Sequence, residues 1–285
     1  MKGHKRAMGF LAQAIASICG CLLALMLALN LTLFREGYYL HQLQNSGCLL
    51  LIYENISEAE QTIARTAGLR ETILDGIVSQ EDVEVAVIRR ADEIWHGSTT
   101  QPDTPYADLV TYLQDTITKE SGQMWTEADT VRYQQVQTVC EDMWRTNAVP
   151  PMANILNFLM QYRQVAWILV FVLAVLFVAC QWLQIVFQKH WRQIGETLAA
   201  IGISVACGTT LTCIAISLSG WKNWMPATDA AYDLYVGWFR GLAPVVAACG
   251  FGLAALVWLA SLYPYRMALY HESRKKHLTT KEQQL

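Results

Sequence analysis

The sequence predicts an all-α membrane protein with four transmembrane helices and a helical domain inserted between helices one and two. Three observations predict this fold class. Only 16% of the 285 residues are charged, against about 25% in average soluble chains. Four apolar runs are each close to or above the ~20 residues that a helix needs to cross a bilayer. The stretch between the first two runs is polar, and it lacks the alternating pattern of strands.

The four apolar runs define the transmembrane helices, which are expected at residues 10–34, 164–187, 194–218 and 241–263. The charged group in these stretches is Glu196, near the start of the third. A cleaved signal peptide is the alternative for the first run. Because apolar signal segments are typically about 7–15 residues long, we expect this longer run to be a retained anchor.

Basic residues beside the spans predict the orientation of the chain. Lys and Arg gather in three stretches that alternate spans place on one side: residues 1–9, 188–193 and 264–285. The loop 219–240 has only Lys222 and Arg240. Since basic loops remain in the cytoplasm, we expect a multi-pass protein of the cell membrane with both termini and a basic tail in the cytoplasm. Residues 35–163 and 219–240 are then extracytoplasmic.

The predicted extracytoplasmic domain is strongly acidic. Residues 35–163 hold 9 Lys and Arg against 19 Asp and Glu, a net charge of −10, and the remainder holds 12 against 5, a net charge of +7. This balance argues against nucleic acid and anionic lipid headgroups as ligands of the domain. It is compatible with a cationic ligand or a basic protein partner, and solubility alone is the alternative explanation. Membrane lipid and a second copy of the chain are further expected partners.

Capping signals predict the helices of this domain. The first span is expected to continue through about residue 66 with a break at 45–47, and a short helix follows at 68–78. Ser79 with Asp82 resembles a capping box and starts a helix. Thr104 with Pro105 starts another, which extends to Lys119. A further helix begins at Thr126, and a last one leads from about Met152 into the second span.

The helix that starts at Ser79 carries many charged groups but is interpreted as a scaffold. Its apolar positions form one stripe at helical spacing: Val83, Val87, Ala91, Ile94 and Trp95. The acids lie largely on the other face, where they do not converge on a metal or a substrate. We therefore expect Trp95 to anchor the core of the domain, and we expect no active site on this helix.

Eight cysteines leave one pairing open. Six lie in the spans, where we expect them to act as small packing residues. Cys48 and Cys140 lie in the predicted extracytoplasmic domain, where they form either a disulfide or two free thiols, since spacing alone does not decide geometry.

Small residues at four-residue spacing predict seams where helices approach closely. The glycines concerned are Gly202, Gly237, Gly241 and Gly252, and the seams would lie within the bundle or between copies. The polar residues of the spans, Asn30, Gln184, Thr209, Thr210 and Thr212 among them, are expected to bond between helices.

No catalytic, cofactor-binding or metal-binding residues are predicted, because the sequence contains no HExxH, GxSxG or Walker-type pattern. A non-enzymatic sensor or scaffold of the cell envelope, binding a partner through its acidic domain, is the expected function. The alternatives are a permease-type subunit of an ATPase-driven transporter and, third, an envelope enzyme.

Several short motifs resemble an uncharacterised family of four-span membrane proteins from Gram-positive bacteria. The resemblance depends on a GL-x-E-x(2)-L patch, a bulky aromatic near the end of the next helix and a D-T pair before the following one. The matching positions are Gly68, Leu69, Glu71, Leu74, Trp95, Asp103 and Thr104. The resemblance implies the four-span topology with a helical domain between spans one and two, and it implies no activity. A weaker, purely topological likeness to permease subunits that partner ATPases supports the transporter alternative.

Overall fold

The computed structural model describes residues 2–98, 103–121, 124–188, 190–220, 223 and 229–282, and only the backbone at 2–8, 121 and 272–282. These residues form helices and turns, and no strand occurs among them. Four helical stretches are long and apolar enough to cross a membrane: Gly9–Leu31, Ala153–Phe187, Trp191–Leu218 and Asp229–His271. The predicted all-α class and the four long apolar helices are confirmed. The described residues leave out two lysines that contribute to the predicted orientation, Lys189 and Lys222. They also leave out residues 99–102 and 283–285.

The chain forms two compact units. The first comprises residues 1–35, 161–224 and 239–285, and we call it the apolar unit. The second comprises residues 36–160 and 225–238, and we call it the polar unit. The polar unit therefore contains most of the segment between the first two apolar helices, together with a short segment from the loop after the third.

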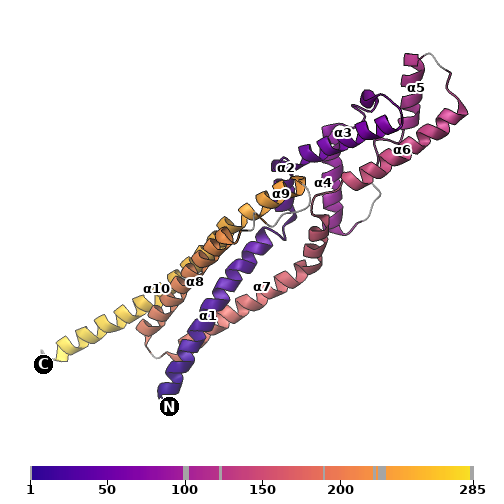
Figure 1. Ribbon diagram of the computed structural model, residues 1–285. Helices are drawn as coiled ribbons and strands as arrows, with labels where there is room; N and C mark the ends of the chain where they lie inside the picture. Colours follow the sequence, from indigo (N-terminus) through magenta and orange to yellow (C-terminus); the bar gives the residue numbers. More distant parts are fainter. Residues whose placement is uncertain are drawn as a thin grey trace. The chain divides into compact units, whose positions relative to one another are not determined.

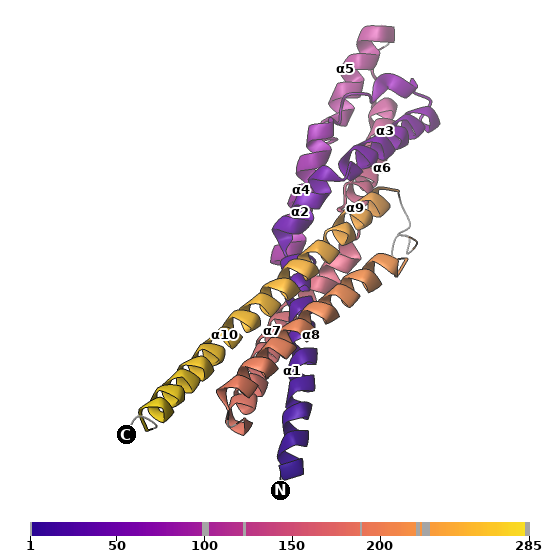
Figure 2. The ribbon, with the colours of Figure 1, turned by 90° about the vertical axis from the view of Figure 1, so that its left-hand side faces the viewer.

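The apolar unit is a bundle of long helices. It contains α1 (Lys2–Leu31), most of α7 (Ala153–Phe187), α8 (Trp191–Leu218) and α10 (Leu242–Glu282). Helices α8 and α10 run side by side and α1 contacts both, as Figures 1 and 2 show. Side chains of α7 join the same core, where Phe177 packs with Leu23, Ile201 and Val257.

Glycines let α8 approach α10 closely, but only part of the predicted seam takes part. A Cβ built on Gly202 would lie 3.1 Å from the carbonyl oxygen of Ala254. Gly252 is exposed, with nothing within 4 Å of its built Cβ, so that part of the prediction is wrong for contacts within this chain. Gly250 faces Thr209 instead. Two residues turn a helix by about 200°, which places Gly252 on the opposite side of α10 from Gly250.

The other two predicted seam residues lie in or directly after α9, near the start of the fourth apolar stretch. Gly237 belongs to the polar unit, where its built Cβ would lie 2.8 Å from Oε1 of Gln42. Gly241 is at the turn between α9 and α10.

Hydrogen bonds of the polar residues in the spans are mostly local, which corrects the expectation of bonds between helices. Thr209, Thr210 and Thr212 each donate to the carbonyl four residues earlier, at 2.7–2.9 Å. A hydroxyl that donates to a carbonyl of its own helix needs no hydrogen-bond acceptor on a neighbouring helix. Gln184 does bond between helices, since its Nε2 donates to the carbonyl of Gly9 on α1 at 2.9 Å.

Short helices build the polar unit. They are α2 (Glu36–Asn45), α3 (Cys48–Thr66), η1 (Glu71–Ile73), α4 (Gln80–His96), α5 (Leu109–Ser121), α6 (Glu127–Asn147), the start of α7 and most of α9 (Asp229–Arg240). Helix α3 contacts α2, α4 and α6, and α5 packs on α6. The core of the unit therefore lies around α3.

Two of the predicted helix starts are confirmed in detail. The Ser79 hydroxyl accepts from the backbone of Asp82 at 3.1 Å, and the Asp82 carboxylate accepts from the backbone of Ser79 at 2.9 Å. Thr126 and Asp129 form the same reciprocal capping box at the start of α6. These boxes satisfy amide groups that would otherwise lack a partner in the first turn.

Two predicted boundaries differ from the structure. Residues 105–108 form a turn closed by bonds between residues three apart, and α5 begins only at Leu109. Thr104 caps that turn, accepting from the amide of Tyr106 at 3.2 Å. The first span also ends earlier than expected, because α1 stops at Leu31 and α2 starts at Glu36. The predicted break at 45–47 is confirmed, with Gly47 in the left-handed region (φ 76°).

Helix α9, from the predicted loop 219–240, packs against α2 within the polar unit. The Tyr38 hydroxyl donates to the carbonyl of Trp238 at 3.2 Å, and the rings of Tyr39 and Trp238 meet edge to face with centroids 5.4 Å apart. The Tyr39 hydroxyl also donates to the carbonyl of Pro151 at 3.0 Å. One buried tyrosine thus joins three parts of the chain that are far apart in sequence.

Candidate functional site

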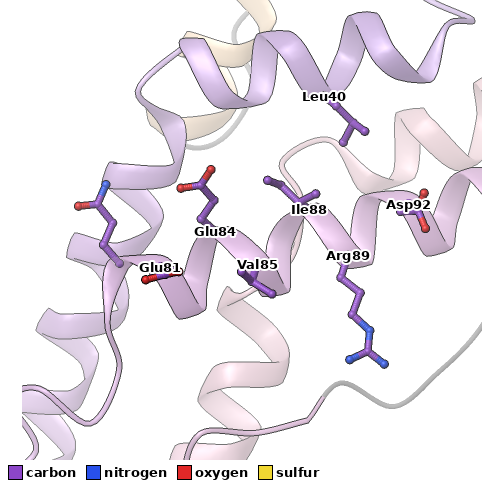
Figure 3. A pocket seen from close by; sticks show the side chains of 8 residues that line it. Leu40, Glu81, Glu84, Val85, Ile88, Arg89 and Asp92 are labelled. Carbon is purple, nitrogen blue, oxygen red and sulfur yellow. The ribbon is translucent and has the colours of Figure 1, made fainter.

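A groove of about 880 Å³ lies between α2 and α4 of the polar unit. Its lining comes from Leu40 of α2 and from seven residues of α4: Gln80, Glu81, Glu84, Val85, Ile88, Arg89 and Asp92. In Figure 3, Leu40 extends from its helix toward α4, while Glu84 and Ile88 extend toward α2. The groove follows α4 from Gln80 to Asp92, thirteen residues whose ends are about 18 Å apart, or three helical turns.

The two sides of α4 explain why the groove forms on this helix. Val83, Val87, Ala91 and Trp95 are buried at a spacing of four residues and hold α4 to the core. Glu81, Glu84, Ile88 and Asp92 follow a second stripe at spacings of three and four, which borders the buried stripe on the side of Trp95. The predicted apolar stripe is buried as expected, except that Ile94 is only half-buried.

Apolar side chains remain accessible inside the groove. The side chain of Val85 is apolar, yet it is 59% exposed. Leu40 and Ile88 are half-buried beside it. These three residues give the groove an apolar lining between charged positions. Sequence reasoning missed this lining because it did not include Val85 and Ile88 in the apolar stripe of α4 and could not place Leu40 beside them.

The charge around the groove is negative. Glu81, Glu84 and Asp92 contribute carboxylates to the lining, and Arg89 is the basic residue among the eight lining residues. The Arg89 guanidinium pairs with Glu93 at 3.3 Å and with Asp103 at 3.4 Å, neither of which lines the groove. Its charge is therefore offset by other carboxylates, and the groove keeps an acidic character.

A cluster with metal-ligand chemistry lies at the Asp92 end of the groove. Glu36 of α2 and Asp92 and His96 of α4 each place one ligand atom within 4.8 Å of the others. The His96 Nδ1 lies 2.9 Å from the carbonyl oxygen of Asp92 and 3.3 Å from its Oδ1. The prediction that α4 takes part in no metal-binding group did not consider Glu36, which is 56 residues earlier and is brought here by folding.

Trp95 lies in the core, as the sequence predicts. It is 3% exposed, and its Nε1 has no hydrogen-bond partner among the described residues. The indole therefore contributes through packing, and no described contact of Trp95 points to a ligand.

A buried carboxyl group beneath the surface was not anticipated from the sequence. Glu60 of α3 is 3% exposed, and the Tyr106 hydroxyl donates to its Oε1 at 2.7 Å. The pKa of Glu60 is raised to about 7, chiefly by burial, while the Tyr106 hydrogen bond lowers it and the negative charge of Asp75 contributes to the rise. Burial, with the charge of Glu60 added, raises the pKa of Tyr106 as well. Because both side chains are enclosed in the core, the pair is not part of a surface site.

Cys48 and Cys140 are free thiols, so the disulfide that spacing left open is not present in the structure. The Cys48 Sγ donates to the carbonyl of Leu43 at 3.3 Å. Burial, with the charge of Glu60 adding to it, raises the pKa of the Cys140 thiol to about 12. Glu60, whose charge acts on Cys140, follows Cys48 by twelve residues, about 18 Å along α3. A disulfide needs Cα atoms about 5.5–6 Å apart.

The residues outside α4 that carry the family resemblance take part in the fold or in surface ion pairs. Gly68 ends α3 in the left-handed region (φ 71°), and Leu74 is fully buried. Glu71 pairs with Arg65 at 2.8 Å, and Asp103 pairs with Arg89.

No protein-family model, curated protein or solved structure matches the chain.

Proposed function

We propose that the protein is a membrane-anchored sensor or scaffold whose polar unit lies outside the cell and binds a basic, amphipathic segment of a partner protein in the groove between α2 and α4. One observation carries this proposal. The groove combines accessible apolar side chains, Leu40, Val85 and Ile88, with an acidic surround. Such a surface suits a helix that has basic residues beside an apolar stripe.

The packing of α9 supports the extracytoplasmic placement. Tyr38 and Tyr39 of α2 contact Trp238 of α9, so these two segments lie on the same side of any membrane that the apolar helices cross. Two spans separate the segments in sequence, which agrees with that requirement. The distribution of Lys and Arg then favours the outside for both.

The dimensions of the groove support a helical occupant. Its length of about 18 Å accommodates three turns of a helix, and helix-in-groove partners use apolar anchors three or four residues apart. Carboxylates at Glu81, Glu84 and Asp92 would meet Lys or Arg beside those anchors. Such charges increase the rate of association and select the partner more than they add raw affinity.

Site-specific photocrosslinking in intact cells tests this proposal. The crosslinking amino acid p-benzoylphenylalanine is placed at Val85 in the groove, and at Val139 of α6 as a control with a similar exposed fraction. We expect one protein adduct from Val85, with the crosslink in a segment rich in Lys or Arg, and no such adduct from Val139.

Charge reversal supplies the matched control. In the Val85 crosslinking background, Glu84→Lys should abolish the adduct, whereas Asp115→Lys on α5, outside the groove, should leave it unchanged. An adduct that persists with Glu84→Lys, or one formed with an acidic segment, contradicts the proposal. Recovery of a stoichiometric ATPase in place of this adduct would indicate a permease-type subunit.

A further inference from the structure

We infer that Glu36, Asp92 and His96 form a binding site for a divalent transition-metal ion such as Zn²⁺, which would join α2 to α4 at one end of the groove. This site goes beyond the proposed function, since metal binding at these residues does not depend on any protein partner.

The geometry brings the ligands together from two helices. Asp92 and His96 are four residues apart on α4 and therefore share one face. Glu36, in the first turn of α2, faces them, and one ligand atom from each residue lies within 4.8 Å of the other two. Zn²⁺ binds nitrogen and carboxylate oxygen at about 2.0–2.2 Å, so small side-chain rotations would bring the three atoms into range.

The ligand types favour a transition metal over calcium or magnesium. Ca²⁺ and Mg²⁺ prefer oxygen ligands alone, whereas imidazole is a common ligand of Zn²⁺, Cu²⁺ and Ni²⁺. The His96 ring is already oriented, because Nδ1 lies at hydrogen-bonding distance from the Asp92 carbonyl.

The electrical balance also fits a divalent cation. Glu36 and Asp92 bring two negative charges, and a neutral imidazole brings none. Asp92 and His96 are exposed and Glu36 is half-buried, so ions reach the site from solvent. Three protein ligands leave a fourth position for water or for a side chain from outside.

Zinc titration of the purified full-length protein in detergent, with affinity tags removed, tests the site. We expect saturable binding of ZnCl₂ in competition with a fluorescent chelator. His96→Ala and Glu36→Gln should each weaken that binding at least tenfold. His41→Ala is the matched control, since His41 is an exposed histidine of α2 outside the cluster. It should leave the affinity unchanged.

A second readout reports on the link between the helices. Zn²⁺ should slow amide hydrogen exchange in α2 of the native protein and of the control His41→Ala. It should not slow this exchange in Glu36→Gln, which removes a charge but no packing. CaCl₂ should produce neither effect. Equal zinc affinity in the native protein and in both cluster variants would overturn the inference, and so would exchange in α2 that Zn²⁺ slows equally in Glu36→Gln.

Discussion

The hydroxyl of Tyr106 lies 2.7 Å from Oε1 of Glu60, and both residues are buried in the polar unit. The tyrosine comes from the turn before α5 and the carboxyl group from α3, so the bond fixes that turn to the core. Trp144 of α6 contacts the Tyr106 ring edge to face, with centroids 6.3 Å apart. A carboxyl group in such surroundings makes the stability of the unit depend on pH.

Glu60→Gln should remove that pH dependence. The pKa of Glu60 is about 7 in the fold, against a usual value of 4.5, so the folded chain keeps a proton that the unfolded chain releases. The contribution of Glu60 to stability is then greatest below about pH 4.5 and falls as the pH rises toward 7, by up to ~3 kcal/mol. The variant should match the native protein at pH 5 and exceed it at pH 8. Denaturant unfolding followed by near-ultraviolet circular dichroism measures this, and parallel pH curves would contradict it.

Tyr106→Phe should destabilise the polar unit by about 1–3 kcal/mol at pH 8, because the ionised Glu60 then loses its described hydrogen-bond donor. The loss should be smaller at pH 5, where Glu60 is protonated. Since the hydrogen bond lowers the pKa of Glu60, its removal should also move the midpoint of the pH dependence upward. The same unfolding curves, recorded across pH, test both effects. Tyr112→Phe, at an exposed tyrosine of α5, is the control.

Trp95→Ala should cost about 3–5 kcal/mol of unfolding free energy, the range for a buried aromatic residue. Val85→Ala on the same helix should cost little, because Val85 is mostly exposed in the groove. Unfolding midpoints of the two variants give the comparison. A silent Trp95→Ala would mean that the indole is not part of the core.

Cys48 and Cys140 should react as two free thiols. In a variant whose span cysteines (Cys19, Cys21, Cys180, Cys207, Cys213 and Cys249) are replaced by alanine, a maleimide reagent should add twice after denaturation, with or without prior reduction. Little labelling is expected in the native state near pH 7.5, since both thiols are buried and the pKa of Cys140 is about 12. If the two cysteines are labelled only after reduction, they form a disulfide, and the prediction of free thiols is wrong.

Sequence patterns predicted those parts of the fold that depend on local chemistry. The four spans follow from continuous apolar runs, and the starts of α4 and α6 follow from Ser79 and Thr126 with an acid three residues later. Burial of Trp95 follows from a stripe at helical spacing. Each of these signals lies within a few turns of one helix.

Features that depend on contacts between distant segments could not be predicted. The groove needs Leu40 beside α4, the metal-ligand cluster needs Glu36 beside His96, and the buried pair joins Glu60 to Tyr106 across 46 residues. The packing of α9 on α2 also spans most of the chain. Gly252 makes no seam within the chain for a related reason, because spacing along one helix does not tell which face meets a neighbour.

Labelling from outside intact cells tests the central claim most directly, which is that the acidic groove on α4 faces the exterior. In a cysteine-free background, Val85→Cys should react with a membrane-impermeant maleimide before the cells are permeabilised. Gln193→Cys, at the exposed start of α8, should react only afterwards. Labelling of Gln193→Cys in intact cells, or protection of Val85→Cys until permeabilisation, would contradict the account.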